Sequence, residues 1–129
     1  MIRLLVRKHL NMNPVKTFED LIIWQKSIVL TKQIYTITRK FPKEEIYGLS
    51  NQLRRASVSV ASNIAEGYGR ITRNDYKRFL SFSFGSTFEI QTQLIICIEI
   101  GIINNEDFNE SMMLSKEISA MLHAIIKKL

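Results

Sequence analysis

Residues 46–70 read IYGLSNQLRRASVSVASNIAEGYGR, and the spacing of their apolar side chains decides the fold. The apolar positions follow one another at intervals of three or four residues: Ile46, Leu49, Leu53, Ala56, Val60 and Ile64. A strand would need a period of two, whereas these intervals keep the apolar side chains on one face of an α-helix. The stretch therefore predicts a helix over about residues 43–66 that ends at Gly67.

The same period on either side of this stretch predicts three more helices, near residues 17–40, 73–100 and 105–128. Thr17 and Asp20 have the spacing of a capping box at the start of the first, and Gly101 ends the third. The third carries a seam of apolar and small residues at heptad spacing: Leu80, Ser83, Thr87, Ile90, Leu94 and Cys97. Four helices with short connections predict an all-α fold, an antiparallel up-down four-helix bundle over residues 17–129.

Hydrophobic residues extend beyond this seam on the third predicted helix, where they include Phe79, Phe82, Phe84 and Phe88. A helix that is apolar on more than one side is buried centrally or at a subunit interface, so we expect a homo-oligomer. Residues 1–16 contain four basic and no acidic residues and predict a poorly ordered N-terminal arm. No stretch approaches the ~20 apolar residues of a membrane span, and we expect a cytoplasmic protein.

Two glycines close together, in GYGRIT at residues 67–72, raise the question of a phosphate-binding loop. The P-loop and dinucleotide-binding motifs both follow a strand and need other glycine spacings, whereas a predicted helix precedes this stretch. We interpret Gly67 as a left-handed residue that caps the second helix, because it has no Cβ to clash. On this interpretation Gly69 gives the chain room to reverse, and the Asn63 side chain bonds the backbone near the turn.

Positive charge is concentrated in the first part of the chain. The net charge is +6, with +9 on residues 1–78 and −3 on residues 79–129. Such a distribution attracts polyanions to one face, or else it pairs with acidic surfaces of other subunits. The candidate nucleic-acid-binding residues lie on the second helix, the following turn and the start of the third: Arg54, Arg55, Arg70, Arg73, Lys77 and Arg78. For one of Arg54 and Arg55, an ion pair with Glu89 on the third helix is the alternative.

The sequence contains no recognisable catalytic or metal-binding constellation. His9 and His123 have no metal-ligand spacing to Cys97, the single cysteine, which lies on the heptad seam where we expect a buried side chain. A di-iron bundle would need Glu-x-x-His motifs, and the sequence has none. We therefore expect no enzymatic activity, no metal and no cofactor.

Four stretches resemble the family of four-helix-bundle proteins whose founding members are encoded in intervening sequences of 23S ribosomal RNA genes. They are FEDLIIWQKS (18–27), FPKEEIYGLSNQLRR (41–55), QLRRASVSVASNIAEGYGR (52–70) and DYKRFLSFSFGSTFEIQTQL (75–94). The resemblance covers about residues 17–128. The chain departs from the family pattern at Ala61, where the family often has proline, so we expect a straighter second helix here.

The resemblance implies a homopentamer without enzymatic activity. A related protein, the accessory variability determinant of diversity-generating retroelements, is a basic pentamer that binds nucleic acid and a reverse transcriptase. One hypothesis is therefore an adaptor that binds RNA or DNA nonspecifically through a basic surface, with an affinity that falls as salt rises. The alternative is a structural homo-oligomer that docks a protein partner, such as a reverse transcriptase, without touching nucleic acid.

Overall fold

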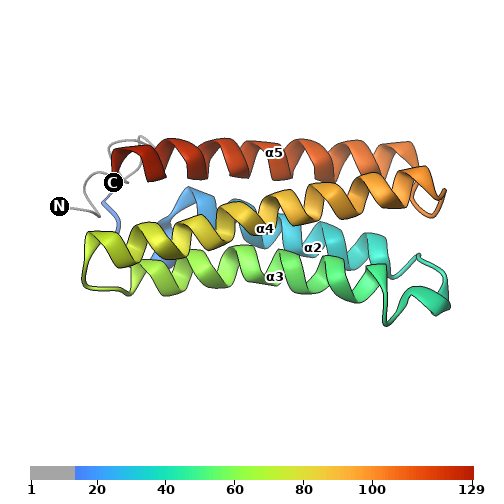
Figure 1. Cartoon of the computed structure of the whole chain (residues 1–129), viewed down its shortest axis with the longest axis horizontal. Coiled ribbons are helices and arrows are strands. Elements are labelled where there is room, and N and C mark those ends of the chain that lie inside the picture. The colour runs from blue at the N-terminus through green and yellow to red at the C-terminus, as the bar shows by residue number, and fades with distance from the viewer. Residues whose placement is uncertain (1–13) are drawn as a thin grey trace.

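The computed structural model describes residues 14–129, and within that range it contains helices and no strands. The helices, drawn side by side along the long axis in Figure 1, are the short 3-10 helices η1 (Phe18–Asp20) and η2 (Lys43–Glu45) and the α-helices α2 (Ile22–Thr38), α3 (Leu49–Tyr68), α4 (Arg73–Glu99) and α5 (Asn105–Lys128). The prediction of an all-α fold with four long helices is confirmed. Most of the predicted N-terminal arm, residues 1–13, lies outside the described residues.

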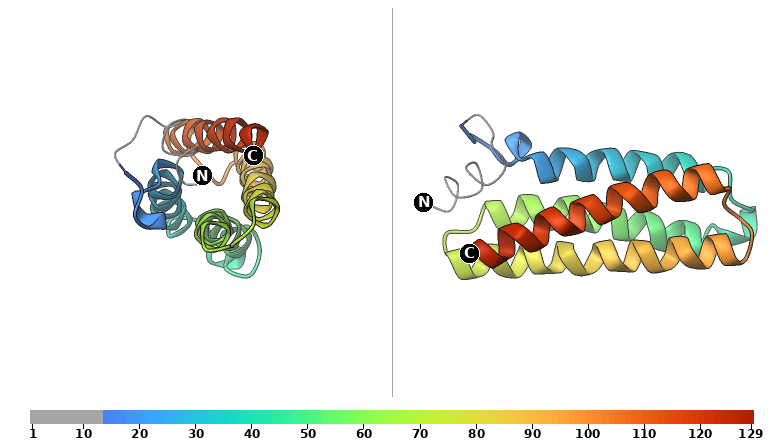
Figure 2. Two further views of the ribbon diagram at one scale, coloured as in Figure 1. Left: turned by 90° about the vertical axis from the view of Figure 1, so that its left-hand side faces the viewer. Right: turned by 90° about the horizontal axis from the view of Figure 1, so that it is seen from above.

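The four α-helices surround one hydrophobic core. Helix α3 packs against α2 and α4, and α5 packs against the same two helices. The view along the helix axes in Figure 2 shows them at the corners of a square. Each helix contributes side chains that are fully shielded from solvent: Ile23, Leu30 and Ile34 from α2; Leu53, Val60 and Ile64 from α3; Leu80, Ile90 and Leu94 from α4; Ile118 and Leu122 from α5. No helix in residues 14–129 combines the length and apolar content needed to span a bilayer.

Small polar residues sit inside this core and bring the helices close together. All six positions of the predicted seam on α4, including Ser83 and Thr87, are buried. The Ser83 hydroxyl donates to the Val60 carbonyl of α3 at 2.8 Å. The Thr31 hydroxyl of α2 donates to the Ser57 carbonyl of α3 at 3.2 Å. These bonds satisfy the buried hydroxyls and tie α3 to both of its neighbours.

The starts of the first two helices differ from the prediction. The predicted capping box of Thr17 and Asp20 is present, but it caps η1, and α2 begins only at Ile22. Helix α3 begins at Leu49, so Ile46 lies before it and is 51% exposed. The Leu49 amide donates to the Glu45 side chain at 3.2 Å, so a carboxylate from η2 satisfies a free amide of the first turn of α3.

The interpretation of Gly67 as a left-handed cap is wrong. Gly67 lies inside α3, and Gly69, at the end of that helix, has a right-handed φ of −79°. Among the described glycines only Gly101, which ends α4 as predicted, has a positive φ, of 80°. The Asn63 side chain likewise stays within α3, where its Nδ2 donates to the Ser59 carbonyl at 2.9 Å.

Gly67 is needed because α4 passes directly over it. A Cβ at this position would lie 2.8 Å from the Phe79 Cβ and 3.3 Å from the Tyr76 carbonyl oxygen. Neither atom belongs to the far end of a flexible side chain, so any larger residue forces the two helices apart.

We expect Gly67→Ala to destabilise the fold by about 1–2 kcal/mol, because overpacking outweighs the gain in helix propensity. Gly85→Ala is the matched control, since Gly85 also lies inside a helix and a Cβ there would meet nothing within 4 Å. That control should stabilise the protein by about 1 kcal/mol through propensity alone. Urea unfolding followed by circular dichroism at one protein concentration measures both. Equal stabilisation by the two substitutions would contradict a close helix contact at Gly67.

Candidate nucleic-acid interface

The end of the bundle where α3 passes into α4 carries four of the six predicted cations. Residues 69–72 connect the two helices, and Thr72 begins α4 by accepting a hydrogen bond from the Asp75 amide at 3.1 Å. We call Arg70, Arg73, Lys77 and Arg78 the α3–α4 basic cluster. Arg73 and Lys77 are four residues apart and share one face of α4, while Arg78 points about 100° away from Lys77, toward the α3 side.

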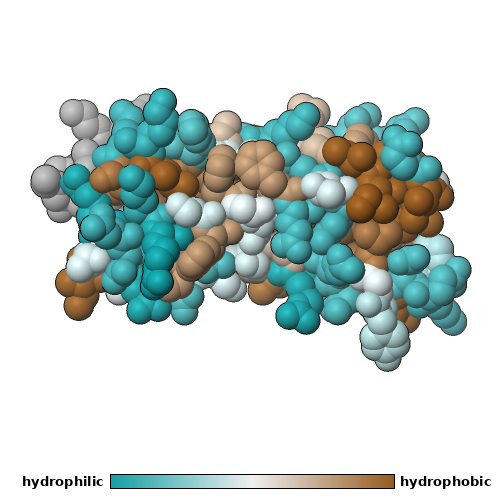
Figure 3. Space-filling view, viewed as in Figure 1, coloured by the Kyte–Doolittle hydropathy of each residue, from teal (hydrophilic) through white to brown (hydrophobic). Residues whose placement is uncertain are grey.

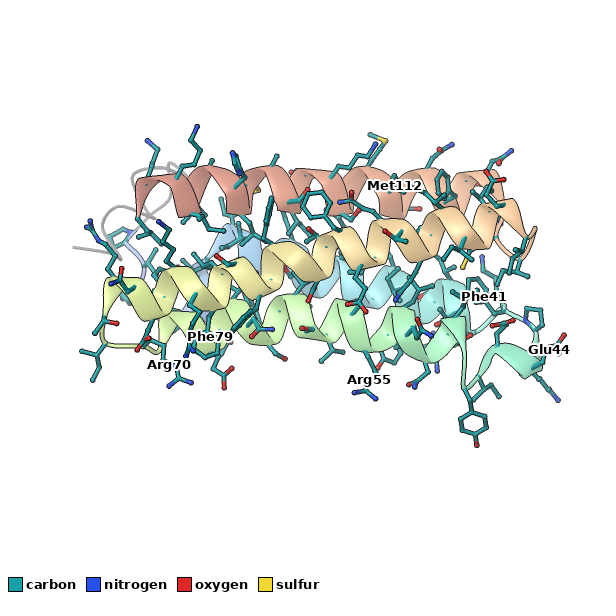
Figure 4. All side chains as sticks on the ribbon, viewed as in Figure 1. Phe41, Glu44, Arg55, Arg70, Phe79 and Met112 are labelled. Atoms are coloured by element: carbon teal, nitrogen blue, oxygen red, sulfur yellow. The ribbon has the colours of Figure 1, made fainter. Side chains whose placement is uncertain are left out.

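Two of these arginines pack against the ring of a buried phenylalanine. The Arg70 guanidinium carbon lies 4.4 Å from the centre of the Phe79 ring, and that of Arg78 lies 5.3 Å from it. Figure 4 shows Arg70 beside Phe79. Phe79 is 8% exposed, so it forms the floor under the two cations. Cation–π attraction to the ring restrains both guanidinium groups while their N–H donors remain available to an anion.

Phe82 completes this arrangement. The ring of Phe82 stands nearly perpendicular to that of Phe79, with the ring centres 5.7 Å apart, and Arg78 lies 5.9 Å from its centre. Phe82 is 49% exposed. Sequence reasoning treated Phe79 and Phe82 only as extra apolar surface. The spacing of Arg78 and Phe82, four residues apart on one helix, was the signal that could have shown a cation beside a ring.

One cation of the cluster, Arg70, lies within 4 Å of a carboxylate of the described residues. A Glu66 carboxylate oxygen lies 3.8 Å from Arg70 Nη2, one helical turn away along the chain. Both side chains are about half exposed, so this ion pair is weak and an incoming phosphate can displace it. Among residues 14–129, no carboxylate lies within 4 Å of Arg73, Lys77 or Arg78.

Arg54 and Arg55 are not part of the cluster. They lie in the first half of α3, whereas Arg70 follows the end of that helix, about 16 residues later in the chain. A helix of that length spans roughly 24 Å. Arg54 turns toward α2 rather than toward Glu89: its Nε donates to the Thr38 hydroxyl at 2.8 Å, and its guanidinium lies 5.0 Å from the Tyr35 ring centre. Arg55 is exposed, and Figure 4 shows it well apart from Arg70. The six candidate residues therefore form two sites rather than one surface.

Cys97 and His123 lie in different surroundings, one in the core and the other on the surface. Cys97 is fully buried, and burial, followed by the negative charge of Glu45, raises the pKa of its thiol to about 11. His123 is exposed on α5, where its ring stacks on Phe84 at 5.8 Å. Residues 14–129 contain no group of three His, Cys, Asp or Glu side chains that could hold a metal ion. At the α3–α4 end, the described residues instead bring together cations and aromatic rings.

We expect the Cys97 thiol to be inert toward a disulfide reagent in the folded protein at pH 8. Its pKa lies above this pH, so the thiolate is scarce, and full burial blocks access. Thiol release should appear only in denaturant. One equivalent of rapid labelling without denaturant would show that Cys97 is not in the core, and a Cys97→Ser variant supplies the blank.

Comparisons with known proteins identify the fold and the family. The sequence profile described as 23S rRNA-intervening sequence protein matches residues 19–124. A crystal structure of a protein of unknown function from the S23 ribosomal protein family of Bacteroides thetaiotaomicron has the same fold, with a TM-score of 0.77 at 23% identity. The match covers 82% of this chain and 99% of that one. No curated protein sequence matches the chain.

The profile match spans all four α-helices, from η1 almost to the end of α5, and so includes the α3–α4 basic cluster. The resemblance that the helix motifs indicated is thus confirmed over nearly the whole described chain. The chain belongs to the family of 23S rRNA-intervening sequence proteins.

Proposed function

We propose that this protein is a non-enzymatic cytoplasmic adaptor that binds RNA or DNA nonspecifically through the α3–α4 basic cluster. The observation that carries the proposal is the pair of arginines, Arg70 and Arg78, held against the buried Phe79 ring. Arginine side chains lose rotamer entropy when they bind phosphate, and a ring that already restrains them reduces this cost. The sequence has no RNP1 motif, which agrees with recognition of the phosphate backbone rather than of base sequence.

The proposed assembly is a homopentamer of antiparallel up-down bundles. The short connections between consecutive helices and the reversal of the trace at each connection in Figure 1 support the antiparallel order. Exposed apolar side chains at the end of α4, among them Ile95, Ile96 and the following Ile100, support burial against another subunit. Figure 3 shows apolar residues gathered at the end where α4 passes into α5. Five linked copies of a weak phosphate site would bind a long polyanion more tightly than one copy, through multivalency.

The same apolar surface favours one other function, a structural homo-oligomer that docks a protein partner. A reverse transcriptase is an example of such a partner, because the related retroelement protein binds one. In that case the basic cluster would face acidic residues of the partner rather than phosphates.

Replacing Arg70, Arg73 and Lys77 together by glutamine should weaken binding of all RNA and DNA sequences alike. Each lost phosphate contact lowers the salt dependence, so the slope of log K against log salt should become shallower by about 2 for single strands. Fluorescence anisotropy with labelled oligonucleotides from about 50 to 200 mM salt covers the range where the effect is large.

The matched control removes the same charge elsewhere. The three control residues are exposed: Lys32, Arg39 and Lys43. They lie in the second half of α2 and in the connection between α2 and α3, away from the basic cluster. Their replacement by glutamine should leave the salt slope almost unchanged. Equal loss in both triple variants would mean that net charge, and not the cluster, drives binding. No binding by the parent protein at low salt would reject the adaptor and favour the protein-docking alternative.

We expect a solution mass five times that of the 15.0 kDa chain. Light scattering coupled to size exclusion at micromolar concentration measures it directly. A monomeric mass would contradict the assembly and would leave the apolar surface of α4 without a partner, and another multiple would revise only the number of subunits.

A further inference from the structure

Phe82 differs from the other exposed aromatic residue of α4 in what surrounds it. Phe82 and Phe88 are 49% and 48% exposed, and both rings contact a second phenylalanine edge-on. A guanidinium lies 5.9 Å from the centre of the Phe82 ring, whereas the described contacts of Phe88 include no cation. Of these two exposed rings, Phe82 is therefore the one that lies beside a described cation.

The Phe82 ring is held in place by its neighbours. It meets the Phe79 ring at 88° with the ring centres 5.7 Å apart, an edge-to-face geometry that is favourable for aromatic pairs. Phe79 is itself fixed by its close approach to Gly67. Contact with a buried ring restrains Phe82, which lowers the ordering cost when a planar group binds against it.

An exposed ring beside restrained arginines is the combination with which proteins bind single-stranded nucleic acid. Bases of a single strand stack on aromatic side chains, and the backbone follows neighbouring cations. Phosphate contacts alone, in contrast, serve a duplex equally well, because its phosphates are exposed while its bases are already stacked.

We infer that the α3–α4 basic cluster prefers single-stranded RNA or DNA, with one base stacked on Phe82 and the adjoining phosphates on Arg78 and Arg70. This inference rests on the proposed function. It adds to it a class of ligand, single strands, and a residue that contacts bases by stacking. Base stacking is tolerant of sequence because every base has a π-face. Phe82 therefore supplies a preference for strand state and not for sequence.

The test compares Phe82→Leu with Phe88→Leu. Both remove an equally exposed ring from the same helix, and leucine keeps helix propensity and apolar character. Affinity is measured for a single strand of 20 nucleotides and for the duplex of the same sequence. Phe82→Leu should weaken single-strand binding about tenfold, since loss of one stacked base has an effect of this order. Duplex binding and the salt slope should change far less, because the closer contact of Arg78 with Phe79 remains. Phe88→Leu should change neither.

A second measurement places the base directly. Phe82→Trp and Phe88→Trp each add an indole to a chain whose single tryptophan, Trp24, lies on α2. The single strand should quench the added fluorescence of the first variant and not that of the second, whereas the duplex should quench neither.

Each other outcome identifies which step is wrong. If the parent binds both nucleic acids with steep salt dependence and Phe82→Leu binds the single strand as tightly, the stacking inference is overturned while the proposed function stands. A change of solution mass in Phe82→Leu, with Phe88→Leu unaffected, would assign Phe82 to a subunit interface and also overturn it. Absence of parent binding at low salt removes the proposed function and this inference together.

Discussion

The close approach of α3 and α4 at Gly67 is the constraint on which the rest of this end of the molecule depends. With no side chain at Gly67, the Cβ of Phe79 can rest on the α3 backbone, where an added Cβ would lie only 2.8 Å away. Farther along, Ser83 donates to the Val60 carbonyl and the hydroxyls of Ser59 and Ser86 lie 3.1 Å apart. Small residues thus keep the two helices close over several turns. The packing has a chemical result, because it buries Phe79 between α3 and α4 and places its ring under Arg70 and Arg78.

In the folded bundle, the acidic second half of the chain pairs with only some of the cations of the first half. Two acidic residues of α5 pair with lysines of α2 and of the segment that follows it: Lys26 Nζ lies 2.5 Å from a Glu117 oxygen, and Lys40 Nζ lies 2.5 Å from an Asp107 oxygen. Negative charge from the second half of the chain is therefore used within the subunit, on the α2–α5 side. At the α3–α4 end, among residues 14–129, Glu66 is the acidic residue whose carboxylate lies within 4 Å of a cluster cation, so the four cations of this end outnumber Glu66 and Asp75. This distribution separates the side of the bundle that is internally compensated from the end that can attract a polyanion.

Periodicity predicted the four helices because burial of one face is a local property of the sequence. It predicted the starts of α4 and α5 but not those of α2 and α3. For α3 the reason is that a free amide of its first turn is satisfied by the side chain of Glu45 in a separate short helix. It also gave the wrong reason for Gly67. The glycine is needed because of Phe79, twelve residues later, and a contact between helices leaves no local signal. For the site, charge counting found the four cations of the cluster, but it grouped them with Arg54, which in the folded chain bonds Thr38. The position of the Phe79 ring under Arg70 and Arg78 could not be predicted either, because it depends on how α3 and α4 pack.

The cations of the cluster fall into two physical classes, and each class suits a different stage of binding. Arg73 and Lys77 have no acidic partner within 4 Å and no described ring contact, so they contribute mainly to the long-range field that steers a polyanion toward the site. Arg70 and Arg78 are restrained against Phe79, and a restrained guanidinium fixes the position of a phosphate more precisely than a flexible ammonium does. Salt screens the first contribution within about 10 Å at 0.1 M, whereas short contacts on an apolar floor are screened less. In the proposed function, the arrangement would therefore couple an encounter that depends strongly on salt to a bound state whose geometry is set by the α3–α4 packing.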